Sequence, residues 1–256
     1  MFKLYPENID YHRCVAYDIQ GTKRRVLVVR KIAVLGLILI TIQGVSLDLI
    51  NVVALYYFSN WGFMASTITF IMLLLAAIRP ENGHGNTVPT CKASHNQDWF
   101  DKAAYSMYQL AWTAQCMITG VFWFFYLFDN EIYASVTTTE SKQMYHILVH
   151  TFPCVMLFID MSVNSIYFHF PQIIFSIVFA IVYAIVAIAL AYTADIVPYP
   201  GITWRNTVSL LFTIEMCLFL LNIFIAGYFF SHHKKKKLIA SFNIELLDIS
   251  SPTSTD

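Results

Sequence analysis

The chain alternates long apolar stretches with short polar breaks. Each apolar stretch is close to the roughly 20 residues that an α-helix needs to cross the hydrocarbon core of a bilayer. The pattern therefore predicts six transmembrane helices. Their expected ranges are 32–57, 61–79, 103–127, 144–166, 172–193 and 206–230.

The breaks between these stretches indicate how the helices connect. Residues 59–62 leave room only for a tight turn, so the first two helices should form an antiparallel pair. A polar loop over residues 129–143 separates the third from the fourth. Pro171 should end the fourth helix and open the fifth, because proline breaks a helix interior but fits a first turn.

Composition supports a membrane protein over a soluble domain. Hydrophobic residues make up 57% of the chain and charged residues 12%, whereas a soluble domain carries about 25% charged residues. The expected fold is an all-α, polytopic bundle with the lipid bilayer as its main partner. We divide it into an N-terminal arm (1–31), a transmembrane domain (32–230) and a basic run with a disordered tail (231–256).

Basic residues are distributed unevenly along the chain. With six helices, 14 of the 16 Lys and Arg residues fall on the side that carries both termini, and only Lys142 and Arg205 fall opposite. The positive-inside rule then predicts cytoplasmic termini. The Lys234 to Lys237 run follows the last apolar stretch, so it is expected to anchor on anionic lipid and not to bind nucleic acid. The sequence favours an endomembrane or plasma-membrane location and does not name the organelle.

Nothing in the sequence predicts a metal or a cofactor. The five cysteines show no paired spacing, and His146 and His150 have neither a third histidine nor the acidic partner of a zinc-protease motif.

Polar side chains inside the predicted spans are the candidate functional residues. Ionisable groups in a membrane are costly, so each one is a candidate site. At 1.5 Å per residue, several lie at similar depth in the half of the membrane away from the termini. They would line a polar chamber, although polar side chains also hold helices together without further function. The chamber residues are Asp48, Asn51, His146 and Glu215, with Ser66, Thr67 and His150 beside them.

Two pieces of chemistry follow from this set. A hydroxyl beside a neutral imidazole forms a minimal nucleophile and base pair, and the similar depth of His150, Ser66 and Thr67 allows such a pair, with Thr67 preferred as the hydroxyl. Asp160 lies ten residues beyond His150, about 15 Å deeper, so it is a structural buried acid that needs another partner.

Four short segments stand out by their aromatic composition, order and spacing: 56–63, 121–129, 150–160 and 197–200. They span nearly the whole membrane part of the chain. In this order they resemble segments of the rolling stone-like and androgen-induced membrane proteins.

This resemblance implies six spans and, in one branch, hydrolysis of fatty-acid esters of hydroxy fatty acids by a threonine and a histidine. That histidine would be His150. The threonine position, four residues after the tryptophan, is occupied here by Ala65, and His146 stands four residues before His150 where the family has three.

Three functions remain open. The first is a multi-pass protein without a catalytic motif, acting in membrane organisation or as a subunit of a membrane assembly. The alternative is a lipid-ester hydrolase that uses His150 with Ser66 or Thr67 on a lipid substrate. A third is a carrier for protons or a small solute, with Asp48, His150 and Glu215 as a relay.

Overall fold

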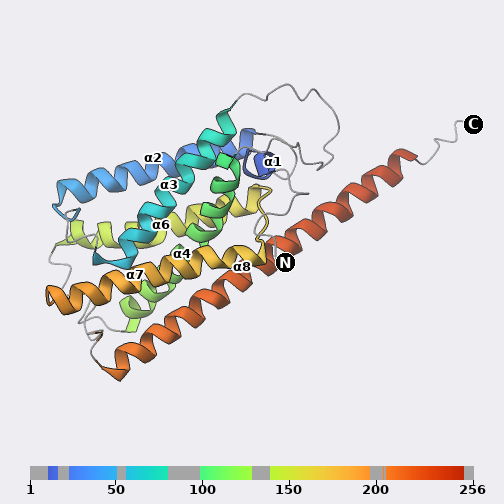
Figure 1. Cartoon of the computed structure of the whole chain (residues 1–256). Coiled ribbons are helices and arrows are strands. Elements are labelled where there is room, and N and C mark those ends of the chain that lie inside the picture. Colours follow the sequence, from blue (N-terminus) through green and yellow to red (C-terminus); the bar gives the residue numbers. More distant parts are fainter. Residues whose placement is uncertain are drawn as a thin grey trace, which may run out of the picture.

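The computed structural model describes residues 11–16, 23–50, 56–79, 99–128, 139–196, 204 and 206–250. Within these ranges the protein is helical (Figure 1). Six of the helices are long and apolar enough to cross a membrane, so the prediction of a six-span helical protein is confirmed for the described residues. The helices are α1 (Tyr11–Ala16), α2 (Arg24–Ser46), α3 (Phe58–Ile78), α4 (Trp99–Phe128), α6 (Glu140–Val163), α7 (Ile173–Thr193) and α8 (Thr207–Ser250).

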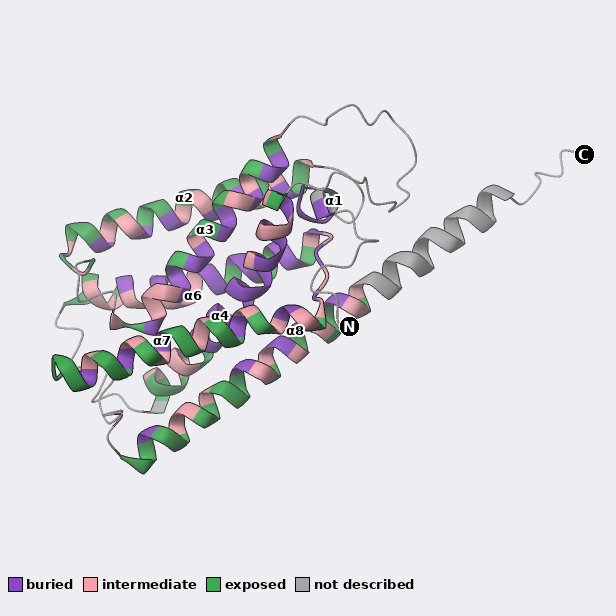
Figure 2. Cartoon of the chain, viewed as in Figure 1, coloured by how far each residue is buried: buried purple, intermediate pink, exposed green. Residues whose placement is uncertain are grey.

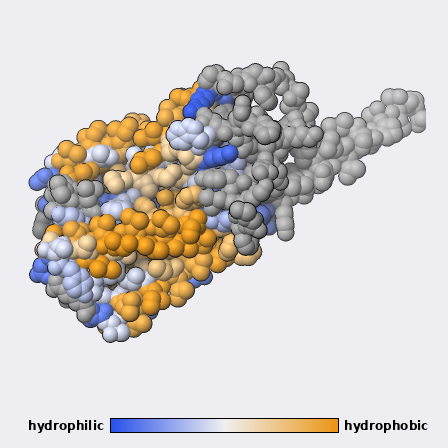
Figure 3. All heavy atoms as spheres, in the orientation of Figure 1, coloured by the Kyte–Doolittle hydropathy of each residue, from blue (hydrophilic) through white to orange (hydrophobic). Residues whose placement is uncertain are grey.

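The spanning helices run side by side, and α3 and α4 are the most buried of them (Figure 2). Large apolar side chains on the outer faces of α2, α7 and α8 remain exposed, and apolar residues cover much of the bundle in Figure 3. An outward apolar surface of this kind is typical of helices that face lipid. Six apolar helices therefore indicate an integral membrane protein.

The first span lies about a third of its length earlier than expected. It was predicted over 32–57, but α2 begins at Arg24 and ends at Ser46. Its end is a Schellman motif: the backbone N–H of Leu49 bonds to the carbonyl of Gly44 (2.9 Å), and that of Asp48 bonds to Val45 (3.0 Å). Asp48 adopts the left-handed conformation (φ 54°) that this motif requires.

The turn predicted over residues 59–62 is therefore wrong. These residues form the first turns of α3, and the connection between α2 and α3 comes earlier in the chain. The start of α2 was predicted eight residues too late because the basic side chains before residue 32 were assigned to a polar arm. Arg24 and Arg25 are exposed at its first turn, where long side chains reach water while their stems cover apolar surface.

The fourth connection is as expected. Asn164 ends α6, an extended segment follows, and Pro171 opens a short 3₁₀ turn, η2 (Phe170–Gln172), that leads into α7. This placement suits proline, which has no N–H to bond in a first turn.

Both terminal regions contain helix where none was predicted. The N-terminal arm includes α1, whose Tyr11, Val15 and Ala16 are fully buried against the bundle. The tail after the Lys234 to Lys237 run was expected to be disordered, but α8 continues to Ser250 and projects beyond the bundle (Figure 1). No Gly or Pro interrupts residues 228–250, and Lys, Leu and Glu are strong helix formers. We call the end of the bundle where α1 packs and α2 begins the α1 end.

Candidate functional site

The imidazole of His150 lies in the middle of α6 with one ring face covered. It stacks on Phe122 of α4, with centroids 4.2 Å apart and planes 9° apart. Its Nδ1 lies 2.6 Å from the backbone carbonyl oxygen of His146, one turn earlier. Because a carbonyl oxygen only accepts, this contact assigns the proton to Nδ1 and leaves Nε2 as the acceptor. The imidazole therefore has the tautomer that a general base needs, but the ring is also packed as a core side chain.

The backbone around His150 has its own structural requirement, which comes from Pro153 inside α6. Proline has no N–H to donate to the carbonyl four residues earlier, that of Val149, and its ring crowds the turn that also carries the His150 carbonyl. The carbonyl oxygen of His150 accepts hydrogen bonds from two α4 side chains, the Thr119 hydroxyl and the Gln115 amide (3.2 Å). In a membrane, backbone groups freed near a proline must find such partners. The polar side chains of α4 are thus explained by helix packing.

The two candidate nucleophiles differ in their surroundings. Thr67 is half-buried and its hydroxyl donates to the carbonyl of Phe63 in its own helix (2.9 Å). Ser66 is fully buried, and its hydroxyl has no hydrogen-bond partner among the described residues. None of the hydrogen bonds between described residues joins either hydroxyl to His150.

Ser66 lies on the face of α3 that approaches α4. One turn before it, a Cβ added to Gly62 would stand 2.1 Å from Ile118 Cδ1 and 3.2 Å from Gln115 Oε1, so the helices meet closely there. Gln115 Oε1 is also buried without a partner in the described part of the chain. A free hydroxyl donor and a free amide acceptor therefore lie on facing helices, and the amide side chain separates α3 from the His150 backbone.

The other members of the predicted chamber are dispersed. Asp48 lies in the turn beyond α2 and is exposed, so it does not lie within a span as its sequence position suggested. Its depth was misjudged because α2 ends eleven residues before the predicted end of the first span. Glu215 is exposed on α8, and His146 is half-buried one turn from His150, with ring centroids 6.1 Å apart. Asn51 lies outside the described residues.

The most completely enclosed charges are at the α1 end. Asp160 of α6 accepts a hydrogen bond from Arg30 Nε of α2 at 2.9 Å, and both side chains are fully buried. Its second oxygen, Oδ2, accepts from the Asn164 amide at 2.7 Å. The partner that Asp160 needs is therefore Arg30, which sequence analysis placed in the N-terminal arm. An unpaired buried acid and a basic residue bordering an apolar stretch were the only signals that could have linked them.

Arg30 and Lys234 also donate to four backbone carbonyls around this ion pair. Arg30 Nη1 donates to the carbonyl of Val15 in α1 and to that of Leu73 in α3 (3.1 Å). Lys234 Nζ of α8 donates to the carbonyls of Met161 (2.7 Å) and Asn164 (2.8 Å) at the end of α6. Arg30, Asp160, Asn164 and Lys234 form what we call the ion-pair network. It joins five helices.

The ion-pair network has a structural role, because it holds the ends of these helices together. Its carboxylate has two bonded oxygens, and the neighbouring Tyr108 hydroxyl donates to the carbonyl of Leu157 (3.0 Å). Tyr11 of α1 packs edge-on against Tyr105, with centroids 5.1 Å apart, and closes the network from the end of the bundle. A fully bonded, covered carboxylate is poorly placed to take part in proton transfer with a substrate.

No group of three or more His, Cys, Asp or Glu side chains among the described residues could hold a metal ion. Cys116 and Cys154 face each other from α4 and α6 as free thiols, with their sulfurs 3.7 Å apart.

Comparison with known proteins gives one match. The family model described as FAR-17a/AIG1-like protein matches residues 50–232. Neither the curated proteins nor the solved structures gave a significant match.

Proposed function

This chain belongs to the FAR-17a/AIG1-like family, and we propose that it acts as a subunit of a membrane assembly, binding a neighbouring transmembrane helix through the outer face of α8. We further propose that the α1 end is cytoplasmic. The uneven distribution of Lys and Arg supports this orientation.

Glu215 is the observation that carries the proposal. It lies eight residues after the first residue of α8, about 12 Å along the helix, and its side chain is exposed. A charged side chain within a spanning helix is costly, up to about 2.5–3.5 kcal/mol at the helix centre on insertion scales, so such residues almost always face a protein partner or a water-filled cavity. An exposed glutamate on an outer helix thus favours a partner that is not part of this chain.

The surroundings of Glu215 suit a helix and not water. Leu211 and Leu218, one turn on either side, are each 55% exposed. The inner face of α8 packs through Leu220 and Phe224, which are buried. We call Leu211, Glu215 and Leu218 the α8 stripe. A spanning helix that presents a Lys, Arg, His, Asn or Gln side chain would cover the leucines and donate to the carboxylate.

Glu215→Leu tests the proposal. The full chain is extracted from its native membrane in a mild detergent, and the size of its complex is measured by native electrophoresis. We expect the variant to insert and accumulate normally, because leucine suits lipid, but to run as the free chain. Glu140→Leu, which alters an exposed glutamate at the start of α6, is the matched control and should leave the complex intact. A complex of unchanged size in Glu215→Leu would contradict the proposal.

Lipid-ester hydrolysis is the second candidate, and the enclosed, unbonded hydroxyl of Ser66 favours it. The resemblance described above supplies His150 as its base. Labelling of the full chain with a fluorophosphonate, followed by mass spectrometry of the modified peptide, tests it. Modification of Ser66 or Thr67 that disappears in His150→Ala would support hydrolysis, and absence of labelling would exclude a reactive hydroxyl.

A proton or solute carrier has less support. Its relay needs Asp48, His150 and Glu215 to lie near one another, but they lie in an exposed turn, within α6 and on the outer face of α8.

A further inference from the structure

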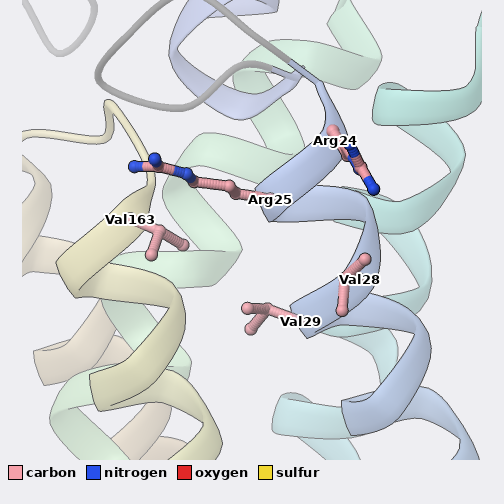
Figure 4. A pocket seen from close by; sticks show the side chains of 5 residues that line it. All are labelled: Arg24, Arg25, Val28, Val29 and Val163. Carbon is pink, nitrogen blue, oxygen red and sulfur yellow. The ribbon is translucent and has the colours of Figure 1, made fainter.

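A pocket of about 420 Å³ lies between the start of α2 and the end of α6 (Figure 4). Arg24, Arg25, Val28, Val29 and Val163 line it. We infer that this pocket binds an anionic phospholipid, with the phosphate at Arg25, Arg24 adding positive charge beside it, and an acyl chain along the valines.

The two arginines flank the pocket from the same helix turn. In Figure 4 Arg25 extends toward α6 and Val163, whereas Arg24 points to the other side of α2. Both side chains are exposed, and neither forms an ion pair or hydrogen bond in the described part of the chain. Guanidinium groups bind phosphate with two parallel hydrogen bonds, so Arg25 is placed to donate to a headgroup in the pocket, and Arg24 adds positive charge at its edge.

The wall of the pocket is aliphatic and continues along the lipid-facing side of α2. Val28 is 52% exposed, and Ile32 and Leu35 follow it on the same face with 53% and 59%. This path leads from the arginines toward the middle of the bundle, the direction in which the acyl chain of a lipid runs. A small soluble anion would bind the guanidinium group but leave the aliphatic wall exposed to water. The structure therefore favours a phospholipid, whose acyl chain would cover that wall.

Charges nearby reinforce the choice of an anionic headgroup. Lys31 lies seven residues after Arg24 and is exposed, which places it on the same face of α2. Behind this face the ion-pair network holds two cations, Arg30 and Lys234, against one carboxylate. Basic pockets between transmembrane helices on the cytoplasmic side are a known binding mode for anionic lipid headgroups.

The test uses the full chain in nanodiscs of phosphatidylcholine, alone or with added phosphatidylserine, and native mass spectrometry to count retained lipid. We expect preferential retention of phosphatidylserine. The double variant Arg24→Gln/Arg25→Gln should weaken it at least about tenfold, because each basic residue near the surface contributes substantially. Val163→Phe keeps every charge but fills the pocket, and it should weaken retention as well. Lys142→Gln, at the opposite end of the bundle, should have no effect.

Three outcomes would overturn the inference. Unchanged retention of phosphatidylserine by Val163→Phe would show that surface charge alone attracts the lipid. Equal loss in Lys142→Gln would show a general charge effect. Competition by soluble glycerophosphate as effective as that by the lipid would show a soluble-anion site. To control for folding, the unfolding midpoint of each variant is measured in pure phosphatidylcholine. It should match that of the unmodified chain. The site lies at the α1 end, away from the α8 stripe, so its result does not depend on the proposed assembly.

Discussion

Arg30 Nε donates to Asp160 Oδ1 across 2.9 Å, between residues 130 positions apart in the chain, with both side chains fully buried. This ion pair fixes the register of α2 against α6. Breaking a buried pair by removing one partner leaves an uncompensated charge and costs about 3–5 kcal/mol.

Asp160→Leu should therefore destabilise the protein by about that amount, and Arg30→Met by a similar amount. Replacing both with apolar residues removes the unpaired charge, so Arg30→Met/Asp160→Leu should recover most of the loss. Unfolding in mixed micelles measures all three. Lys31→Met, which changes the exposed neighbour of Arg30, should be near-silent. Additive losses in the double variant would show that the two residues do not act as a pair.

The hydrogen bond from Thr119 to the His150 carbonyl should depend on Pro153. Thr119→Val removes this donor, and hydrogen bonds between membrane helices are worth about 0.6 kcal/mol on average. In a Pro153→Ala background the restored N–H bonds to the Val149 carbonyl and the proline ring no longer crowds the adjoining His150 carbonyl, so the loss should shrink. A double-mutant cycle by unfolding checks this coupling. A cycle with no coupling energy would mean that Thr119 acts independently of the proline.

Ser66→Ala should leave stability unchanged or raise it. A buried hydroxyl without a partner carries a desolvation cost of about 1–3 kcal/mol, and alanine removes that cost with little change in volume. Thr69→Ala is the matched control, because the Thr69 hydroxyl donates to the Met107 carbonyl of α4 at 3.1 Å, and its removal should destabilise. A clear loss of stability in Ser66→Ala would show that its hydroxyl is bonded.

Apolar length and composition predicted much of this fold, but the ion-pair network could not be predicted in this way. Apolar length alone locates α3 to α7 and the start of α8 within a few residues, because a helix that faces lipid must be apolar over the length that crosses the bilayer. Arg30 and Lys31 look like the end of a cytoplasmic arm, and only the contact with Asp160, 130 residues away, makes a buried arginine tolerable in α2. A pairing between residues so far apart in the chain leaves no periodic pattern in the sequence.

Candidate site residues were harder to predict for the same reason. The depth estimate that grouped Asp48 with His150 assumed that α2 runs to residue 57, but the left-handed conformation of Asp48 itself ends the helix. Rotation about each helix axis decides whether Glu215 faces inward or outward, and sequence spacing does not fix that rotation. The histidine pair at positions 146 and 150 did lie on one helix face, as a spacing of four predicts.

The orientation of the bundle gives a prediction of its own. If the α1 end is cytoplasmic, a cysteine introduced at Glu140, at the opposite end of α6, should react only with reagent added to the non-cytoplasmic side. The native cysteines are replaced by serine or alanine beforehand, and a cysteine at Lys102 provides the cytoplasmic counterpart. Labelling of position 140 from the cytoplasmic side would reverse the orientation.

Cross-linking from the α8 stripe tests the central claim, that α8 binds a neighbouring transmembrane helix at Glu215. A photoreactive phenylalanine analogue is placed at Leu218 of the full chain in its native membrane, and the matched control position is Leu39 of α2, with 55% and 56% exposure respectively. We predict a discrete protein adduct from position 218 and none from position 39. The cross-linked peptide should come from a spanning helix with a Lys, Arg, His, Asn or Gln side chain, and the adduct should vanish in Glu215→Leu. Only diffuse lipid adducts at both positions, or an adduct that persists in Glu215→Leu, would contradict the claim.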